Sequence, residues 1–337
     1  MDLKAMHNLI EESGLPSFRE KQIRKAYFSE LRSGWDDVSV LSKELREKFA
    51  ADVKWNDVDE LKIAKTKDTI KAALKLEDGE VIEAVLIKHG DGRRTVCVSS
   101  QVGCPMRCFF CATGKSGFKR NLEIGEIIDQ VLYFARILKE NNEKITNIVF
   151  MGMGEPLLNY DNVMKAIRLL NDPEGFGLGA RHISISTCGI VPGIQKLAKE
   201  KLQINVALSM HAPTDKLRGA LMPVNDQYDL SQVMEAIDYY IKNTNRRVMI
   251  EYLMIKDKND RAEDAKNLSD VLKNRSLCYV NLIPYNDTGG AFSVSSRDNI
   301  KRFSDVLKEN NVRFTIRHSF GDSIDAACGQ LARKASF

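Results

Sequence analysis

The sequence predicts an α/β fold in which a parallel sheet closes in part into a (β/α) barrel, with a small N-terminal helical domain and a β-hairpin extension before it. Two observations carry this prediction. After residue 94, short apolar segments alternate with amphipathic helical stretches, which is the order of a parallel sheet with crossover helices. Before residue 94, a helical pattern is followed by strand-like alternation around a turn. The 337 residues suffice for one large domain and a smaller accessory one.

The first part of the chain, residues 1–58, is predicted to be a helical accessory domain. Apolar residues recur at helical spacing between residues 17 and 31 and again between residues 40 and 49. The first of these helices is basic, so it offers contacts to phosphate groups, although a solvated helix face explains the charge equally well. The basic residues are Arg19, Lys21, Arg24 and Lys25.

The next part, residues 59–94, is predicted to be the hairpin, with its turn at Asp78 and Gly79. The remainder, residues 95–337, is predicted to be the barrel core with a C-terminal cysteine segment. Its strands are expected near residues 95–99, 145–151, 182–186, 203–209, 247–255, 277–283 and 313–317, and its helices at residues 124–139, 160–170, 230–242, 262–272 and 296–308. Functional residues of such a barrel lie at the C-terminal ends of its strands.

Composition limits the class of protein. Hydrophobic residues make up 43% of the chain and charged residues 28%, and no apolar run is long enough for a membrane span. The seven cysteines are an odd number, and no secretory h-region follows Met1, so we expect a cytoplasmic protein with no membrane partner. The net charge of +4 permits a nucleic-acid partner without requiring one. A monomer is expected.

Three cysteines, Cys104, Cys108 and Cys111, lie just after the first barrel strand with the spacing Cys-x3-Cys-x2-Cys. Thiolates this close on one loop can hold an iron–sulfur cluster. Three protein ligands leave one iron of a four-iron cluster open, and an open iron can bind a substrate. The spacing therefore predicts a metal centre that performs chemistry.

Zinc is the alternative metal. Cys108 and Cys111 alone form a Cys-x2-Cys pair, and Cys97 would complete a set of four thiols. A structural zinc site usually has two well-separated ligand pairs, however, and no second pair follows here. We therefore favour the iron–sulfur interpretation. The remaining cysteines are isolated: Cys188, Cys278 and Cys328.

The cysteine run resembles the signature of radical S-adenosylmethionine (SAM) enzymes, and its surroundings are similar to the RlmN/Cfr family of rRNA adenine methyltransferases, closest to the RlmN branch. Matching blocks follow in family order at residues 97–104, 152–159, 186–192, 207–213 and 324–331. The resemblance implies a partial barrel of radical SAM type. It also implies one [4Fe–4S] cluster, held by Cys104, Cys108 and Cys111, and two molecules of SAM consumed per turnover.

Contacts to SAM are expected on the rim of the barrel. Gly154 would let the backbone approach a ligand, and the Glu155 carboxylate could pair with the SAM amino group. Taken singly, each rim residue is also explained by ordinary loop packing. The resemblance assigns SAM contacts to Gly154, Glu155, Ser186, Ser209, Met210, His211 and Asn286.

The resemblance also implies three catalytic residues. Cys328 takes a methyl group from one SAM by displacement, and a 5′-deoxyadenosyl radical from a second SAM then abstracts hydrogen from that methyl group, so that the carbon radical adds to adenine. Cys97 matches the thiol that forms a disulfide with Cys328 to release it. Taken alone, Cys97 is also explained as a buried strand cysteine or a fourth metal ligand. Glu83 matches the proton acceptor, although a glutamate in a strand commonly faces solvent.

The family divides by the carbon that is methylated. In the antibiotic-resistance branch, which acts on carbon 8, alanine stands where this chain has Pro156 and cysteine where it has Val102. The resemblance therefore favours carbon 2, with an adenine of the peptidyl-transferase centre of 23S rRNA and the adenosine 3′ of the anticodon in tRNA as substrates. An electron donor such as flavodoxin or ferredoxin is implied. The alternatives are a Cfr-like carbon 8 methyltransferase and a zinc-stabilised RNA-binding protein without catalysis.

Overall fold

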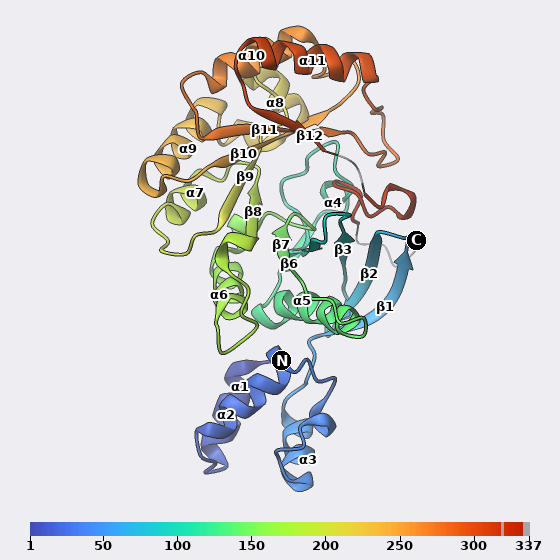
Figure 1. The fold of residues 1–337 in the computed structure, drawn as a ribbon, viewed down its shortest axis with the longest axis vertical. Coiled ribbons are helices and arrows are strands. Elements are labelled where there is room, and N and C mark those ends of the chain that lie inside the picture. Colours follow the sequence, from blue (N-terminus) through green and yellow to red (C-terminus); the bar gives the residue numbers. More distant parts are fainter. Residues whose placement is uncertain (318–319, 333–337) are drawn as a thin grey trace.

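The computed structural model describes residues 1–317 and 320–332. Within these residues, ten strands form one open sheet in the order β1-β2-β3-β4-β7-β8-β9-β10-β11-β12. In this order, each strand from β4 onward is parallel to the next one, up to β12. The sheet curves into an arc with helices outside it (Figure 1). The predicted α/β fold with a partly closed barrel is thus confirmed.

The parallel strands begin and end within a few residues of their predicted positions, because each is a short apolar run bounded by turn residues. They are β4 (Arg94–Cys97), β7 (Asn147–Phe150), β8 (Ile183–Thr187), β9 (Asn205–Ser209), β10 (Val248–Met254), β11 (Cys278–Pro284) and β12 (Phe314–Ile316).

The antiparallel end of the sheet contains the predicted hairpin, β2 (Thr69–Leu76) and β3 (Val81–Lys88). A strand that was not expected, β1 (Val58–Lys65), pairs with β2. Since β3 pairs with β4, the hairpin continues the barrel sheet. The domain boundaries themselves stay a prediction, and residues 318–319 and 333–337 of the predicted barrel domain lie outside the described residues.

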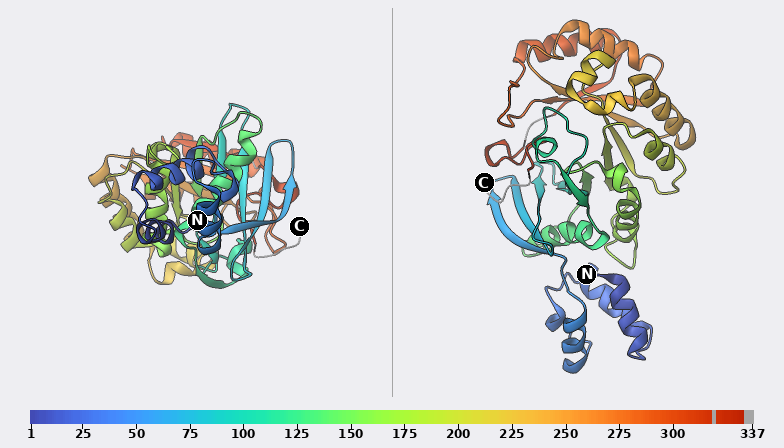
Figure 2. Two further views of the ribbon diagram at one scale, coloured as in Figure 1. Left: turned by 90° about the horizontal axis from the view of Figure 1, so that it is seen from below. Right: turned by 180° about the vertical axis from the view of Figure 1, so that it is seen from behind.

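Helices cover the convex face of the sheet (Figures 1 and 2). A capping box between Glu123 and Glu126 starts α5. Two short helices, α7 and α8, were not expected. The helices of the barrel part are α5 (Ile124–Lys139), α6 (Tyr160–Asn171), α7 (Val191–Leu197), α8 (Asp215–Leu221), α9 (Leu230–Thr244), α10 (Ala262–Leu272) and α11 (Arg297–Glu309). No helix of the described residues is long and apolar enough to span a bilayer.

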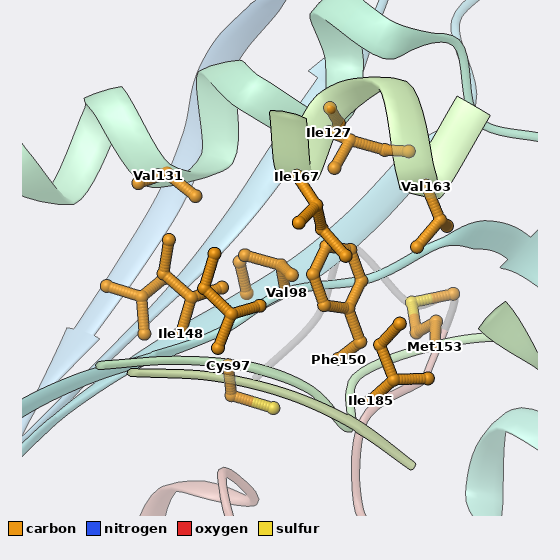
Figure 3. Close-up of a cluster of buried hydrophobic side chains, with 14 of the residues drawn as sticks. Cys97, Val98, Ile127, Val131, Ile148, Phe150, Met153, Val163, Ile167 and Ile185 are labelled. Atoms are coloured by element: carbon orange, nitrogen blue, oxygen red, sulfur yellow. The ribbon is translucent and has the colours of Figure 1, made fainter. Parts of the chain in front are cut away.

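Alternation along the strands divides the two faces of the sheet. Figure 3 shows Ile148 on the face that packs against Val131 of α5 and Ile167 of α6. The sulfur of Cys97 points to the other face (Figure 3). Ile148 is fully buried. The convex side of the sheet is therefore an apolar core, and the concave side is where Cys97 lies.

The N-terminal helices α1 (Leu3–Glu12), α2 (Phe18–Arg24) and α3 (Lys43–Asp52) project from one end of the molecule (Figure 1). Arg24 pairs with Asp172 at 3.0 Å, which ties this part to the end of α6. The other basic residues that offered phosphate contacts also have protein partners: Arg19 donates to the Val40 carbonyl, Lys21 lies 3.6 Å from Glu174, and Lys25 lies 3.6 Å from Glu30.

Inside the arc lie a two-stranded ribbon, a short helix and the C-terminal segment (Figure 1). Backbone and side-chain hydrogen bonds join the segment to the helix. Ala112 N donates to the Gly329 carbonyl at 2.8 Å, and Thr113 Oγ1 donates to the Leu331 carbonyl at 2.6 Å. Two segments more than 200 residues apart in sequence thus meet at the concave face. The inner elements are β5 (Gln101–Gly103), β6 (Phe118–Asn121) and α4 (Ala112–Lys115).

Candidate active site

The cysteine run forms a tight loop between β5 and α4. Gly103 starts the loop at a φ of 76°, where a Cβ atom would lie 1.7 Å from the Gly117 carbonyl oxygen, so only glycine fits. Cys111 N donates to the Cys108 carbonyl at 3.1 Å, which closes the loop just before α4 begins. The geometry turns all three predicted cluster cysteines, Cys104, Cys108 and Cys111, toward one cavity.

This cavity, of about 160 Å³, lies between the cysteine loop, the C-terminal ends of the parallel strands and the C-terminal segment. Its position matches the expectation for a barrel enzyme. The lining includes the following side chains: Cys104, Cys108, Cys111, Phe150, Met151, Gly154, Glu155, Ser186, Cys188, Ser209, His211, Glu251, Arg317 and Cys328. We refer to it as the cluster cavity.

The three thiols fit a multi-iron cluster. Burial raises the pKa of the Cys108 thiol, and the neighbouring Cys111 and Cys104 raise it further. A cationic metal centre would remove this electrostatic cost by binding the thiolates. In the part of the chain that the structure describes, no three His, Cys, Asp or Glu side chains converge on a point that could hold a single metal ion. Thiols spread around one cavity suit a cluster in which each thiolate binds a different iron.

The predicted SAM contacts fall into two groups. Gly154, Glu155, Ser186, Ser209 and His211 line the cluster cavity. Met210 is fully buried and does not line it. Asn286 lies instead beside the C-terminal segment, where its side chain donates to the Cys328 carbonyl at 3.2 Å.

Glu155 is more constrained than the sequence suggests. Its carboxylate accepts from Leu157 N at 3.0 Å and from Cys188 N at 2.8 Å. The side chain is 3% exposed, and burial raises its pKa. Glu155 therefore joins the loop after β7 to the loop after β8, and only its remaining lone pairs are available to a ligand.

Ser209 and His211 are held in place by their neighbours. Ser209 Oγ lies 3.1 Å from Ser186 Oγ, across two adjacent strands. His211 Nδ1 accepts from Leu253 N at 3.0 Å, and its ring meets that of Phe110 edge to face. Burial and the Arg218 charge lower the pKa of His211 to about 3, so its imidazole is neutral at pH 7.

A second, smaller cavity of about 30 Å³ adjoins the first. Cys97 of β4 and Cys328 of the C-terminal segment both line it, together with Asn286 and Arg317. Cys328 and Arg317 line both cavities. One thiol is thus accessible from the cluster side and from the Cys97 side.

Comparison with known proteins agrees with this geometry. The family model of the radical SAM superfamily matches residues 98–268. A probable dual-specificity RNA methyltransferase RlmN of Dictyoglomus turgidum is 44% identical over 331 residues, covering 98% of this chain and 94% of its own. One of the same name from Bacillus thuringiensis is 44% identical over 336 residues, covering 99% and 92%. The crystal structure of a radical SAM methyltransferase from Sphaerobacter thermophilus superposes with a TM-score of 0.96 at 40% identity, covering 99% of this chain and 98% of that one.

The chain belongs to the RlmN family. It is an enzyme of the radical SAM methyltransferase class. Membership of that class implies a [4Fe–4S] cluster and SAM, and the thiol donor set of the cluster cavity fits such a cluster.

The disulfide that the RlmN/Cfr resemblance implies is not supported. All seven cysteines are free in the structure, Cys97 and Cys328 among them. Burial raises the pKa of Cys97 to about 12, and the nearby Cys328 contributes to this rise. A thiol with this pKa stays protonated near neutral pH and does not attack readily. The two residues share a cavity as separate thiols.

Glu83 is buried on β3, on the side of the sheet that faces the C-terminal segment. One oxygen forms an ion pair with Lys71 Nζ at 2.8 Å, and the other accepts from Ala332 N at 2.7 Å. Lys71 also donates to the Asp325 carbonyl at 3.0 Å. Burial raises the pKa of Glu83. The pair therefore holds the segment that carries Cys328, and the role of Glu83 as a proton acceptor stays a prediction.

Sequence reasoning missed two charged residues of this RlmN-family site. Glu251 lies in the middle of the apolar strand β10, and Arg317 follows β12. Both line the cluster cavity. A single acid within the run Val248–Met254 was a usable signal, because parallel strands buried on both faces are nearly continuous apolar runs. Arg317 carried no comparable signal.

Proposed function

We propose that this protein methylates carbon 2 of adenine in two RNAs, the peptidyl-transferase centre of 23S rRNA and tRNA at the adenosine 3′ of the anticodon, with Cys328 as the carrier of the methyl group. The observation that carries the proposal is that Cys328 lines the cavity of the three cluster cysteines and also the cavity of Cys97. The run already supplies the three cluster thiols, so Cys328 is available for another role.

A methyl carrier is needed because adenine cannot take the methyl group from SAM directly. A ring carbon of adenine is not nucleophilic, so it does not attack the methyl group of SAM, whereas a cysteine thiolate does. When bound, the cluster and SAM supply the radical that removes a hydrogen atom from a methyl group. Cys328 holds that methyl group at the cavity, whereas Cys97 lines the adjoining cavity as a protonated thiol, so its part in the release of Cys328 stays a prediction.

Arg317 places a positive charge beside the carrier thiol. Its guanidinium lies beside both thiols, and the pKa of Arg317 is raised chiefly by Cys328 and in smaller part by Glu251 and Cys97. A cation beside a cysteine favours the thiolate, which is the nucleophilic form. The loss of a proton from the adenine adduct requires a base, and Glu83 remains the predicted one.

Carbon 2 is favoured over carbon 8 by Pro156 and Val102, where the resistance branch has alanine and cysteine. The relatives named as dual-specificity RNA methyltransferases support the pair of RNA substrates. The proposal includes a monomer in the cytoplasm, two SAM molecules per turnover, and an electron donor such as flavodoxin or ferredoxin. A target base must leave its stack to enter this cavity.

The decisive experiment locates the methyl group. Enzyme with a reconstituted cluster is incubated anaerobically with SAM, a reductant and either 23S rRNA fragments or tRNA, and the product nucleosides are identified by mass spectrometry. We expect 2-methyladenosine from both RNAs and none from the Cys328→Ala variant. 8-Methyladenosine would instead identify the Cfr-like activity, and methylation by Cys328→Ala would refute the carrier role.

Metal analysis tests the non-catalytic alternative. Protein purified without oxygen should be brown and contain about four irons per chain. A colourless protein that binds RNA and contains zinc would contradict the proposed function.

A further inference from the structure

Glu251 carries an unexplained carboxylate oxygen in the cluster cavity. Its side chain is 3% exposed, and its Oε1 atom is buried with no hydrogen-bond partner in residues 1–317 and 320–332. Nor does Glu251 form an ion pair within 4.0 Å among those residues. A buried polar atom without a partner costs about 1–3 kcal/mol, so native proteins rarely keep one without a reason.

The other carboxylate oxygen is held by a row of side chains across the sheet. Thr315 Oγ1 donates to Asn281 Oδ1 at 3.0 Å, and Asn281 Nδ2 donates to Glu251 Oε2 at 2.9 Å. The three residues are direct neighbours in register on β10, β11 and β12. Because this row fixes Oε2, the carboxylate has one defined orientation, and Oε1 is left to the cavity that Glu251 lines.

The surroundings of Glu251 indicate which ligand it serves. Ser209 is its register neighbour on β9, and the Glu251 carbonyl accepts from Met210 N and His211 N. Glu251 is thus bound directly, through its backbone, to the predicted SAM contacts at the end of β9. Arg317 lines the cavity as well and supplies the positive charge that a buried carboxylate needs nearby.

The amino-acid end of SAM belongs at the other side of the cavity. Gly154 and Glu155 follow β7, whereas Glu251 is on β10, three strands further along the sheet. Three strand spacings amount to about 14 Å along the sheet. A ligand whose ammonium group is at Glu155 therefore extends its nucleoside toward Glu251. A carboxylate that accepts from a ribose hydroxyl is a recurrent device for nucleoside recognition.

We propose that Glu251 Oε1 accepts a hydrogen bond from a ribose hydroxyl of SAM, and that the row Thr315–Asn281–Glu251 positions this oxygen. The inference rests on the proposed function only in taking SAM as the ligand. It assigns Glu251 a binding role, distinct from that of Glu155, whose two carboxylate oxygens already accept backbone N–H groups.

The test measures binding and not turnover. S-Adenosylhomocysteine, which has no methyl group to transfer, is titrated calorimetrically into enzyme with a reconstituted cluster, and so are its 2′-deoxy and 3′-deoxy forms. In the native protein, removing the contacted hydroxyl should weaken binding roughly 10- to 100-fold, the range of a hydrogen bond to a charged group. In Glu251→Ala, S-adenosylhomocysteine itself should bind about as weakly as that deoxy form binds to the native protein. In this variant, the deoxy form should bind at most about two-fold more weakly than S-adenosylhomocysteine.

Two further variants keep the result decisive. Glu251→Gln preserves the shape of the side chain and removes its charge, so it should show an intermediate preference for the hydroxyl. It also replaces Glu251→Ala if that variant gives no cooperative thermal transition. Asp238→Asn changes a carboxylate of the outer helix α9 that pairs with Arg275, and it should retain the full preference. Binding of S-adenosylhomocysteine by the native protein confirms that the nucleoside site exists.

The outcomes separate the two ideas. If the native protein does not bind S-adenosylhomocysteine, the proposed function itself fails. If it binds the ligand but tolerates both deoxy forms, or if Glu251→Ala keeps the preference for the hydroxyl, the role of Glu251 is overturned. Unchanged ligand binding combined with a higher KM for RNA would assign Glu251 to the target adenine and overturn the inference as well.

Discussion

The two faces of the sheet are built by different means. On the convex face, Val98 and Ile148 pack against helices that are adjacent to them in the chain order (Figure 3). On the concave face, Cys97, Glu251 and Arg317 meet Cys328 from a segment near the C-terminus. The first face is apolar and continuous, whereas the second is a set of thiols and charged groups around two cavities.

This difference separates the part of the molecule that stabilises the fold from the part that carries the functional groups. The convex face buries apolar area and contributes to the free energy of folding. The concave face contains buried groups that cost free energy, such as Glu155, Glu251 and the Glu83–Lys71 pair. Substitutions on the concave face should therefore affect function selectively, except where they break a paired charge.

The largest effect is expected at the cysteine loop. Cys108→Ala should lower the iron content from about four per chain to less than one and lower methylation by at least about 10³-fold, because the cluster loses one of its three protein ligands. Iron assay, the visible absorption spectrum and the methylation assay provide the measurements.

Cys188→Ala is the matched control for this substitution. Cys188 is buried and lines the same cavity but lies outside the run. Its variant should keep about four irons. Equal iron loss in both variants, or none in Cys108→Ala, would contradict the assignment of the ligands.

The next effect concerns the ion pair that holds the C-terminal segment. Lys71→Met leaves the Glu83 carboxylate buried without its partner, and both side chains are at most 3% exposed. Breaking such a pair should lower the free energy of unfolding by about 3–5 kcal/mol. It should also lower methylation, because Lys71 holds Asp325, three residues before Cys328.

Urea denaturation measures this loss, and Lys75→Met provides the control. Lys75 is exposed on the same strand, β2, so its variant should stay within about 0.5 kcal/mol of the native protein. An unchanged urea midpoint for Lys71→Met would show that the pair does not stabilise the concave face.

The convex face was the more predictable one. Helices α5 and α10 begin and end at the predicted residues, because their apolar residues recur at helical spacing and polar caps bound them. Strand β1 was missed, since most of its residues are exposed and it carries no apolar alternation. A periodic pattern of apolar residues arises where one side of an element is buried. An exposed edge strand therefore has no such pattern in its sequence.

The concave face was predictable only in part. The spacing of Cys104, Cys108 and Cys111 indicated a metal centre, because all its ligands lie on one loop. The placement of Cys328 depends on hydrogen bonds such as that from Thr113 to Leu331, between residues 218 apart. Such tertiary contacts have no local pattern. For the same reason, the occupied lone pairs of Glu155 and the free oxygen of Glu251 could not be predicted.

A smaller effect is expected from a single truncation on the convex face. Ile148→Ala removes a fully buried side chain between the sheet and α5, and it should lower the free energy of unfolding by about 2–4 kcal/mol. Methylation per folded molecule should stay near the native value, because Ile148 lines neither cavity. Urea denaturation and the methylation assay, compared with Ile148→Val as the milder control, measure both quantities. A variant of native stability without activity would reverse the proposed division between the faces.

The last expected effect is gradual, a pH dependence of stability on the concave face. His211 has a folded pKa of about 3, lowered by burial and by Arg218, whereas an unfolded histidine titrates near 6.5. Below about pH 6.5 this histidine binds a proton in the unfolded chain but stays neutral in the folded protein. The stability that the neutral His211 contributes is therefore complete above pH 6.5 and is lost as the pH falls toward 3. The slope should approach about 1.4 kcal/mol per pH unit.

His211→Asn keeps an acceptor for Leu253 N but does not titrate, so its urea midpoint should fall less steeply between pH 6.5 and 4. His182→Asn, at an exposed position, is the control and should follow the curve of the native protein. If the native protein and His211→Asn gave parallel curves, the imidazole of His211 would not be held neutral.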